Sequence, residues 1–592
     1  MGLRSGLRDS PGAWAAGVVT AAAVLLGLAY ANALDAAFVF DDEASIVENS
    51  TIRRLWPLAD VLAAKVEGGR THDGRPLLNL SLALDYAAHG LWRPGFRIVN
   101  LAIHLGNVLL VCDVARRLLR VMPLRSSDAR LLAALTSLLW AVHPLHTNVN
   151  TYVIQRAESL GAFFILAAFD AAIVSLSRGS LPAALAAGML AILGATAKET
   201  TAAILPLVAA FAWAFHTRLP AAGRDRRVRP LLYGGLAVNL VAIGLLAATL
   251  GGRGGSAGLA TASVSRYLLT QCQAIWLYAG KLLWPATLVL DHGEWLAAGP
   301  AAVWPAALAT ATLVGGTALG FAWRPRIFFP LVAAAILLAP TTSVVPVRTQ
   351  TIAEHRMYLP AAFLIGWLVA AGAAAARACG RRAVSGTPRA ARAGPAAVMA
   401  VVGVVAVLAA GSVARTMARN RDFASAVSLW RQNVRDCPAN DRGSTNLVAA
   451  LIRDSRFAEA WPLALAAVEA RPDRERNWLN LGRLYAEAGQ DDEALEAFAT
   501  AIRLAPGEAD ARINLGIVLS RGADLERAIV TLTEAIALRP DAAKGWLARG
   551  LARLRQERPD LALPDLEHAV QLDPENPAGR HNLAVARRAL GL

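Results

Sequence analysis

Long apolar segments, separated by short polar stretches, fill the first 414 residues of the chain. Eleven of them are close to the roughly 20 residues that an α-helix needs to cross the hydrocarbon of a bilayer. These segments cover residues 14–34, 97–119, 129–146, 157–177, 181–196, 200–216, 231–250, 300–321, 327–344, 359–376 and 395–414. The pattern predicts a polytopic membrane bundle of about eleven spanning helices.

A further apolar segment, residues 267–284, differs from these because it contains two glutamines and Lys281. If it crossed the membrane once, Arg324 and Arg326 would lie on the opposite face from the other arginine-rich loops. We therefore expect this segment to be a re-entrant or interfacial helix.

Arginines are concentrated in the loops 115–130, 216–230 and 377–394. Positively charged loops tend to stay in the cytoplasm, so these loops and the N-terminus are predicted to be cytoplasmic. Because the number of spans is odd, residues after 415 are expected on the extracytoplasmic side. The long first loop, 35–96, is expected on that side too.

The last part of the chain repeats with a period of 34 residues. Prolines recur at Pro438, Pro472, Pro506, Pro540 and Pro574, and alanines recur at Ala460, Ala494, Ala528 and Ala562. This period is the signature of tetratricopeptide repeats, which stack helix pairs into an α-solenoid. We expect four repeats over 439–574 and a capping helix over 575–592, with a concave face that binds an extended protein segment.

The predicted fold is therefore all-α and has two parts: a membrane domain over 1–414 and a repeat domain over 439–592, joined by a linker over 415–438. The composition agrees, since 55% of the 592 residues are hydrophobic. The net charge of +15 comes from arginines placed in the loops of one face, so nucleic acid is not expected as a partner. The four cysteines form no CxxC pair, which argues against a disulfide framework.

Ionisable residues of other types gather in the loops predicted to be extracytoplasmic. The groups are Asp41-Asp42-Glu43, Arg75, His143 with His146, Arg156 with Glu158, Lys198-Glu199, Asp291-His292 and Glu354-His355-Arg356. Ionisable groups collected on one membrane face mark a functional site more often than chance would. Asp41 and Asp42 follow the first span directly, where a base for a lipid-linked substrate would have to lie.

Six runs of the sequence carry a family resemblance. They are FVFDDEASIVENSTIRRL, GRPLLNLSLALDYAAHGLW, AVHPLHTNVNTYVIQRAESLGAFF, ATAKETTAAILPL, IAEHRMYLPAAFL and RNRDFASAVSLWRQNVRDCPANDRGSTNL. In this order they resemble the transmembrane and tetratricopeptide-repeat-containing O-mannosyltransferases, which are GT-C glycosyltransferases. The resemblance implies transfer of a sugar, in that family mannose, from a polyprenyl phosphate outside the cytoplasm. A short repeat array and a composition rich in Ala, Arg and Gly favour a bacterial member, in the cytoplasmic membrane.

Phosphate is already a leaving group in such a donor, so the protein has to deprotonate the acceptor hydroxyl and hold the phosphate. Asp41 and Asp42 are the candidate bases, and attack would invert the anomeric carbon. The carboxylate that is not the base, or Glu43, would orient the acceptor or bind a metal. The cofactor is thus left open between none and a divalent metal, and no metal ligand is assigned.

The candidates for binding substrate or phosphate are the remaining polar residues of these loops, namely Arg75, His143, His146, Arg156, Lys198, Glu199, Glu354, His355 and Arg356. Two pairs, Arg156 with Glu158 and Lys198 with Glu199, also suit structural ion pairs at helix ends. The two histidines are a weak metal signal, because the intervening proline breaks helical spacing.

Three functions compete at this point. The first is the glycosyltransferase, whose partners would be a polyprenyl-phosphate-linked sugar, a protein or glycan acceptor, a protein on the repeats, and membrane lipid. The second is a non-catalytic membrane-anchored scaffold for envelope or glycan assembly. The third is a transporter for a lipid-linked glycan, which would place ionisable groups near the middle of the membrane.

Overall fold

The computed structural model describes residues 11–63, 71–120, 126–219, 227–249, 264–342, 350–383, 393–522 and 524–592. Within these ranges the chain is built from helices and contains no strand, so the all-α prediction is confirmed. It divides into two compact units. One comprises Met1–Val47 and Thr51–Ser428, and the other comprises Glu48–Ser50 and Leu429–Leu592. The main division lies inside the segment 415–438 that was predicted to join the two halves.

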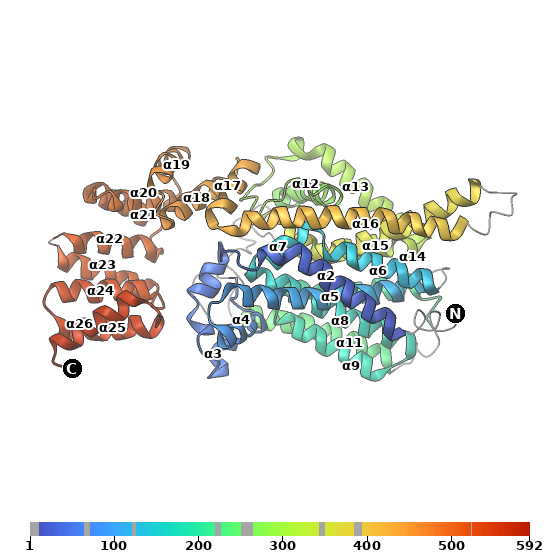
Figure 1. Ribbon diagram of the computed structural model, residues 1–592, viewed down its shortest axis with the longest axis horizontal. Coiled ribbons are helices and arrows are strands. Elements are labelled where there is room, and N and C mark those ends of the chain that lie inside the picture. The colour runs from blue at the N-terminus through green and yellow to red at the C-terminus, as the bar shows by residue number, and fades with distance from the viewer. Residues whose placement is uncertain are drawn as a thin grey trace. The chain divides into compact units, whose positions relative to one another are not determined.

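The first unit is a bundle of long apolar helices (Figure 1). They are α2 (Pro11–Tyr30), α5 (Arg93–Arg120), α6 (Ser126–Ala141), α8 (Arg156–Arg178), α9 (Leu181–Ala195), α10 (Ile204–Phe215), α11 (Val228–Thr249), α12 (Val264–Leu283), α13 (Pro300–Trp323), α14 (Pro325–Thr342), α15 (Tyr358–Ala383) and α16 (Ala393–Asn420). Among the described residues, eight helical stretches are long and apolar enough to cross a membrane. The chain is therefore a multi-pass membrane protein.

Each of the eleven predicted spans corresponds to one helix, but three of these helices, α6, α9 and α10, have only 16, 15 and 12 residues and are not among the eight stretches. Helix α6 stops at Ala141, before the predicted end at 146, because His143 caps a short 3₁₀ turn that begins at Pro144. Helix α10 begins only at Ile204, after the 3₁₀ turn η6 (Glu199–Ala203). These turns matter because they carry candidate site residues.

The two ends of the bundle differ in their charges. At one end Arg117 bridges Asp113 of α5 and Asp170 of α8, and Arg377 of α15 pairs with Asp128 of α6. Parts of the arginine-rich loops at this end, which we call the arginine end, lie outside the described residues. The opposite end carries most of the remaining ionisable groups, and we call it the polar end.

Helix α12 lies along the polar end instead of crossing the bundle. Near its start the Tyr267 hydroxyl donates to the carbonyl of Thr341 at 2.7 Å, and near its finish Lys281 Nζ lies 2.5 Å from Glu354 Oε1. Thr341 ends α14 and Glu354 precedes α15, so both ends of α12 contact the same end of the bundle. This agrees with the interfacial helix expected for 267–284.

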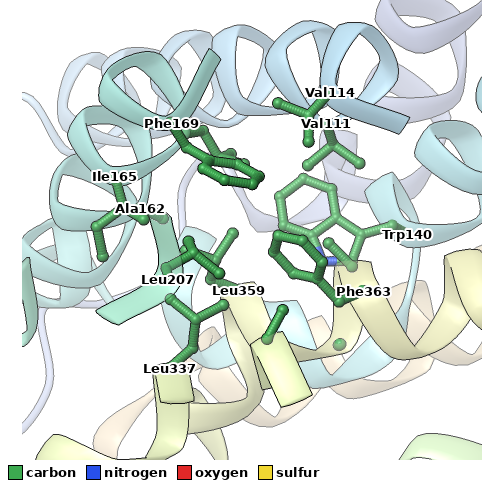
Figure 2. Packing of buried hydrophobic residues seen from close by; sticks show 14 of the residues in the cluster. Val111, Val114, Trp140, Ala162, Ile165, Phe169, Leu207, Leu337, Leu359 and Phe363 are labelled. Atoms are coloured by element: carbon green, nitrogen blue, oxygen red, sulfur yellow. The ribbon is translucent and has the colours of Figure 1, made fainter. Parts of the chain in front are cut away.

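The core of the bundle is a cluster of buried aromatic and aliphatic side chains on α5, α6, α8, α10, α14 and α15 (Figure 2). Phe169 lies between Phe211 at 5.6 Å and Phe329 at 6.2 Å, measured between ring centroids. The backbones of helices α9 and α11 pack directly against each other, since a Cβ added to Gly188 would lie only 3.0 Å from the Cα of Gly235.

Four shorter elements connect the bundle at its polar end: α3 (Leu58–Leu62), α4 (Pro76–His89), α7 (Thr147–Asn150) and the 3₁₀ turn η9 (Glu354–Met357). The last helix, α16, returns to this end. Asn420 donates to the carbonyl of Ala29 at 2.9 Å, and Ala37 donates to the carbonyl of Phe423 at 3.1 Å. The chain therefore leaves the bundle at the end that also carries the loop after α2.

The second unit consists of paired helices with the predicted 34-residue period. They are α18 (Asp441–Arg453), α19 (Phe457–Ala470), α20 (Glu475–Glu487), α21 (Asp491–Leu504), α22 (Ala509–Arg521), α23 (Leu525–Leu538), α24 (Ala543–Arg555), α25 (Pro559–Leu572) and α26 (Pro577–Ala589), preceded by α17 (Ala426–Asp436). The repeated glycines permit close pairing: a Cβ on Gly482 would lie 2.7 Å from the ring of Phe498, and one on Gly516 would lie 2.5 Å from Leu532.

Candidate functional site at the polar end

The loop after α2 gives the two neighbouring aspartates different surroundings. Phe40 adopts a left-handed conformation with φ of 53°, which costs a non-glycine residue about 1–3 kcal/mol. Asp42 is fully buried, and its carboxylate accepts hydrogen bonds from the backbone N–H of Ile154 at 2.8 Å and of Val39 at 3.3 Å. Burial raises the pKa of Asp42 to about 7, although these bonds oppose the rise.

Asp41 is half-buried. Its Oδ2 accepts a hydrogen bond from the hydroxyl of Thr71 at 3.0 Å, and its backbone N–H donates to the hydroxyl of Tyr152 at 3.0 Å. Burial and the nearby charges of Asp41 and Asp42 raise the pKa of Tyr152 well above its usual value, so the phenol stays protonated. Asp41 is thus the more exposed of the two aspartates.

Thr71 connects Asp41 to a second carboxylate. Arg75 donates through Nη1 to the carbonyl of Thr71 at 2.7 Å and through Nη2 to Glu199 Oε1 at 3.0 Å. The Glu199 side chain is 37% exposed, so this ion pair is partly open to the surroundings.

A second ion pair lies beside the first. Lys198 donates to Glu158 of α8, and His355 Nε2 lies 3.7 Å from the same Glu158 oxygen. The charges of Lys198, Arg356 and Arg75 all act on His355, so the three cations lie near it. A series of contacts thus runs from Asp41 through Thr71 and Arg75 to Glu199. Lys198, the neighbour of Glu199 in the sequence, extends it to Glu158 and His355.

A small cavity opens next to these pairs. Its polar wall is formed by Glu158, Thr200 and Arg356, and its apolar wall comes from α8, α14 and α15. The guanidinium of Arg356 donates to the carbonyls of Thr341 and Thr351, each at 3.1 Å, and so is already held in place.

Arg156 and Glu354 lie in other networks. Arg156 is fully buried and donates to Asp85 and Asn100, each at 2.6 Å, and to the carbonyl of Phe96 at 2.9 Å. Glu354 accepts from Lys281 at 2.5 Å and from the backbone of Val289 at 2.9 Å, so it holds α12 and the following loop. The polar contacts of both side chains thus hold other parts of the protein in place.

The two histidines of the HPLH run are packed into the protein. His143 accepts a backbone hydrogen bond from Leu145, and its Nε2 lies 2.9 Å from the carbonyl oxygen of Leu282. His146 packs against Trp140 and Tyr358, with ring centroids 4.9 and 5.0 Å away. The described part of the chain holds no group of three or more His, Cys, Asp or Glu side chains placed to bind a metal ion.

Three participants were not singled out from the sequence: Thr71, Tyr152 and Asp85. Asp85 and Tyr152 lie within the motif runs LDYAAH and NTYVIQ, so the motifs contained them without indicating a role. Thr71 follows a segment with no recognisable pattern, and only the fold shows that it touches Asp41.

Comparison with known proteins finds two kinds of similarity. Models of the tetratricopeptide repeat family match residues 476–508 and 513–577. Protein O-mannosyl-transferase TMTC4 of Homo sapiens is 34% identical over 27% of this chain and 23% of its own length. Protein O-mannosyl-transferase Tmtc3 of Drosophila melanogaster is 35% identical over 24% of this chain and 17% of its own length. The chain thus spans about a fifth of the length of the curated relatives it matches, and its resemblance to this family is confirmed.

A solved tetratricopeptide protein, TTC0263 of Thermus thermophilus, aligns with 30% of this chain and 93% of that chain. The identity is 20% and the TM-score is 0.26.

Proposed function

We propose that this protein is an integral-membrane glycosyltransferase that moves a sugar, most simply mannose, from a polyprenyl phosphate to a hydroxyl of a protein or glycan. The observation that carries the proposal is the line of hydrogen bonds and ion pairs from Asp41 to His355 at the polar end of the bundle. It places an accessible carboxylate beside cations, as an acceptor hydroxyl and a leaving phosphate require. The names of the curated relatives support the sugar and the acceptor type.

Asp41 acts as the general base in this account. Its carboxylate takes the proton of the acceptor hydroxyl while the hydroxyl oxygen attacks the anomeric carbon. The bond from that carbon to the phosphate oxygen breaks on the opposite side, so the configuration inverts. Thr71 and Tyr152 fix the position of Asp41. Asp42 keeps the loop in place through its two backbone hydrogen bonds.

The cations beside Asp41 hold the leaving phosphate. Arg75 and Lys198 each already pair with a glutamate, and a bound phosphate would share these cations through charge-assisted hydrogen bonds. Arg356 adds a further cation, Thr200 offers a hydroxyl, and the neutral imidazole of His355 offers a hydrogen-bond donor.

The polar end would face the extracytoplasmic side of a bacterial cytoplasmic membrane. The support is the positive-inside rule, since the arginines lie at the other end. The repeats would then be extracytoplasmic and would bind the acceptor or a partner of the assembly machinery, a protein segment in extended form.

The test is sugar transfer by the purified protein in lipid vesicles, with a panel of polyprenyl-phosphate donors that carry different labelled sugars. Arg75→Gln should reduce transfer strongly, whereas Arg116→Gln, the same replacement at the arginine end, should not. If no donor of the panel loses its sugar faster than in empty vesicles, the enzyme proposal fails and the scaffold function takes its place.

A further inference from the structure

A second cavity, of about 380 Å³, opens at the arginine end of the bundle. Its walls come from α5, α6, α8, α10, α14 and α15, and all but two of its lining side chains, Thr136 and Arg326, are non-polar or aromatic. The volume falls within the range of about 300–1,000 Å³ that is typical of ligand sites. None of the residues assigned above to the polar end lines this cavity.

The cavity exists because one face of α15 carries almost no side-chain volume. Ala362, Gly366, Ala370 and Ala374 follow one another at intervals of four residues and all line it. Residues four apart lie on the same helix face. Opposite them stand larger side chains, including Phe329 of α14. Ala374 is exposed, so the space opens to the outside of the bundle at its arginine end.

The charged residue of the lining is Arg326, near the start of α14. It is half-buried, and its guanidinium lies 3.5 Å from the hydroxyl of Thr217 at the end of α10. Within the described ranges no carboxylate lies close enough to form an ion pair with it. Such an arginine at the mouth of an apolar cavity in a membrane domain matches an anionic amphiphile, with phosphate on the guanidinium and hydrocarbon inside.

We infer that this cavity binds one acyl chain of an anionic phospholipid from the leaflet at the arginine end, with the lipid phosphate on Arg326. The site is separate from the proposed sugar-transfer site and does not depend on it. Helices α14 and α15 line both this cavity and the small cavity at the polar end. A bound acyl chain would therefore pack between α14 and α15, which also position Thr341 and Arg356. Binding of the lipid would stabilise the folded bundle by mass action.

The experiment is photo-crosslinking in vesicles that contain phosphatidylglycerol with a diazirine in its acyl chain, followed by peptide mapping. Labelling is expected on α14 and α15 around Phe329 and Trp367. Ala370→Phe fills the cavity and should reduce this labelling about tenfold. Ala375→Phe, an exposed position on the same helix that does not line the cavity, should leave it unchanged.

The headgroup is tested by a second variant that leaves the cavity open. Arg326→Gln removes the charge and should weaken labelling by phosphatidylglycerol about tenfold, with little effect on a diacylglycerol probe, which has no phosphate. Equal labelling of wild type and Ala370→Phe would show that the space is only a packing void. Stronger labelling of the same peptides by a diazirine polyprenyl phosphate would assign the cavity to an isoprenoid lipid and overturn the choice of phospholipid.

Discussion

Arg156 offers a test of whether the site has been drawn correctly, because it was a candidate for holding phosphate. Its guanidinium is fully buried and pairs with Asp85, whose side chain is 7% exposed. It also donates to Asn100 and to the carbonyl of Phe96. We therefore expect Arg156→Met to act on the stability of the bundle rather than on binding of the donor.

The magnitude follows from what the substitution leaves behind. Removing one partner of a buried ion pair lowers the free energy of unfolding by about 3–5 kcal/mol, because the other charge stays buried without its counter-charge. Burial raises the pKa of Asp85 and the charge of Arg156 opposes that rise, so without Arg156 the carboxyl will take up a proton more readily. The loss in Arg156→Met should consequently be smaller at acid pH. Replacing both partners, as in Arg156→Met with Asp85→Leu, should recover most of the stability.

The assay is unfolding of the purified protein in detergent, followed by helical circular dichroism at several pH values. Sugar transfer is measured on the same samples at a temperature where every variant remains folded. The reasoning is refuted if Arg156→Met keeps the stability of the wild type but loses donor binding. That result would make Arg156 a ligand of the phosphate.

Three further outcomes are expected. The raised pKa of Asp42 means that its protonated form is favoured in the folded state. The free energy of unfolding should therefore fall by up to about 4 kcal/mol as the pH rises from about 4 through 7. Asp42→Asn should flatten this part of the pH profile, measured by thermal unfolding. Gly188→Val should push α9 from α11 and cost about 1–3 kcal/mol, whereas Gly244→Val, in open space, should cost less than about 1 kcal/mol in the same thermal assay. Lys281→Met leaves Glu354 buried without its cation and should loosen α12. Maleimide should then react several-fold faster with Cys272, which lies on α12. An unchanged rate would contradict the anchoring role of Lys281.

The sequence allowed the helices and the repeats to be predicted because both depend on local, periodic signals. The length of each apolar segment predicts a membrane helix. The recurrence of glycine, alanine and proline every 34 residues predicts closely packed helix pairs. The position of α12 along one end of the bundle was also predictable, since two glutamines and Lys281 interrupt its apolar sequence. In the structure Gln271 and Lys281 make hydrogen bonds at the polar end.

The pairing of charges within the site was not predictable in the same way. Sequence neighbours suggested Lys198 with Glu199 and Arg156 with Glu158. In the fold Lys198 pairs with Glu158, Glu199 pairs with Arg75, and Arg156 pairs with Asp85. The partners come from different helices, so the choice depends on tertiary packing that no local pattern records.

The same limit applies to the two aspartates. Their separate environments come from the left-handed turn at Phe40 and from residues about 110 positions away, Tyr152 and Ile154. The sequence places a carboxylate pair beside the membrane. Only the fold distinguishes the half-buried Asp41 from the fully buried Asp42.

The central claim is that Asp41 is the base and that Asp42 only supports the loop. The most direct measurement compares sugar transfer by wild type, Asp41→Asn and Asp42→Asn in vesicles with a labelled polyprenyl-phosphate mannose donor. Each rate is referred to the amount of folded protein. The account predicts a loss of about 100-fold or more for Asp41→Asn, as expected for removal of a general base, and a rate within about threefold of wild type for folded Asp42→Asn. Full activity in Asp41→Asn, or loss confined to Asp42→Asn, would contradict it.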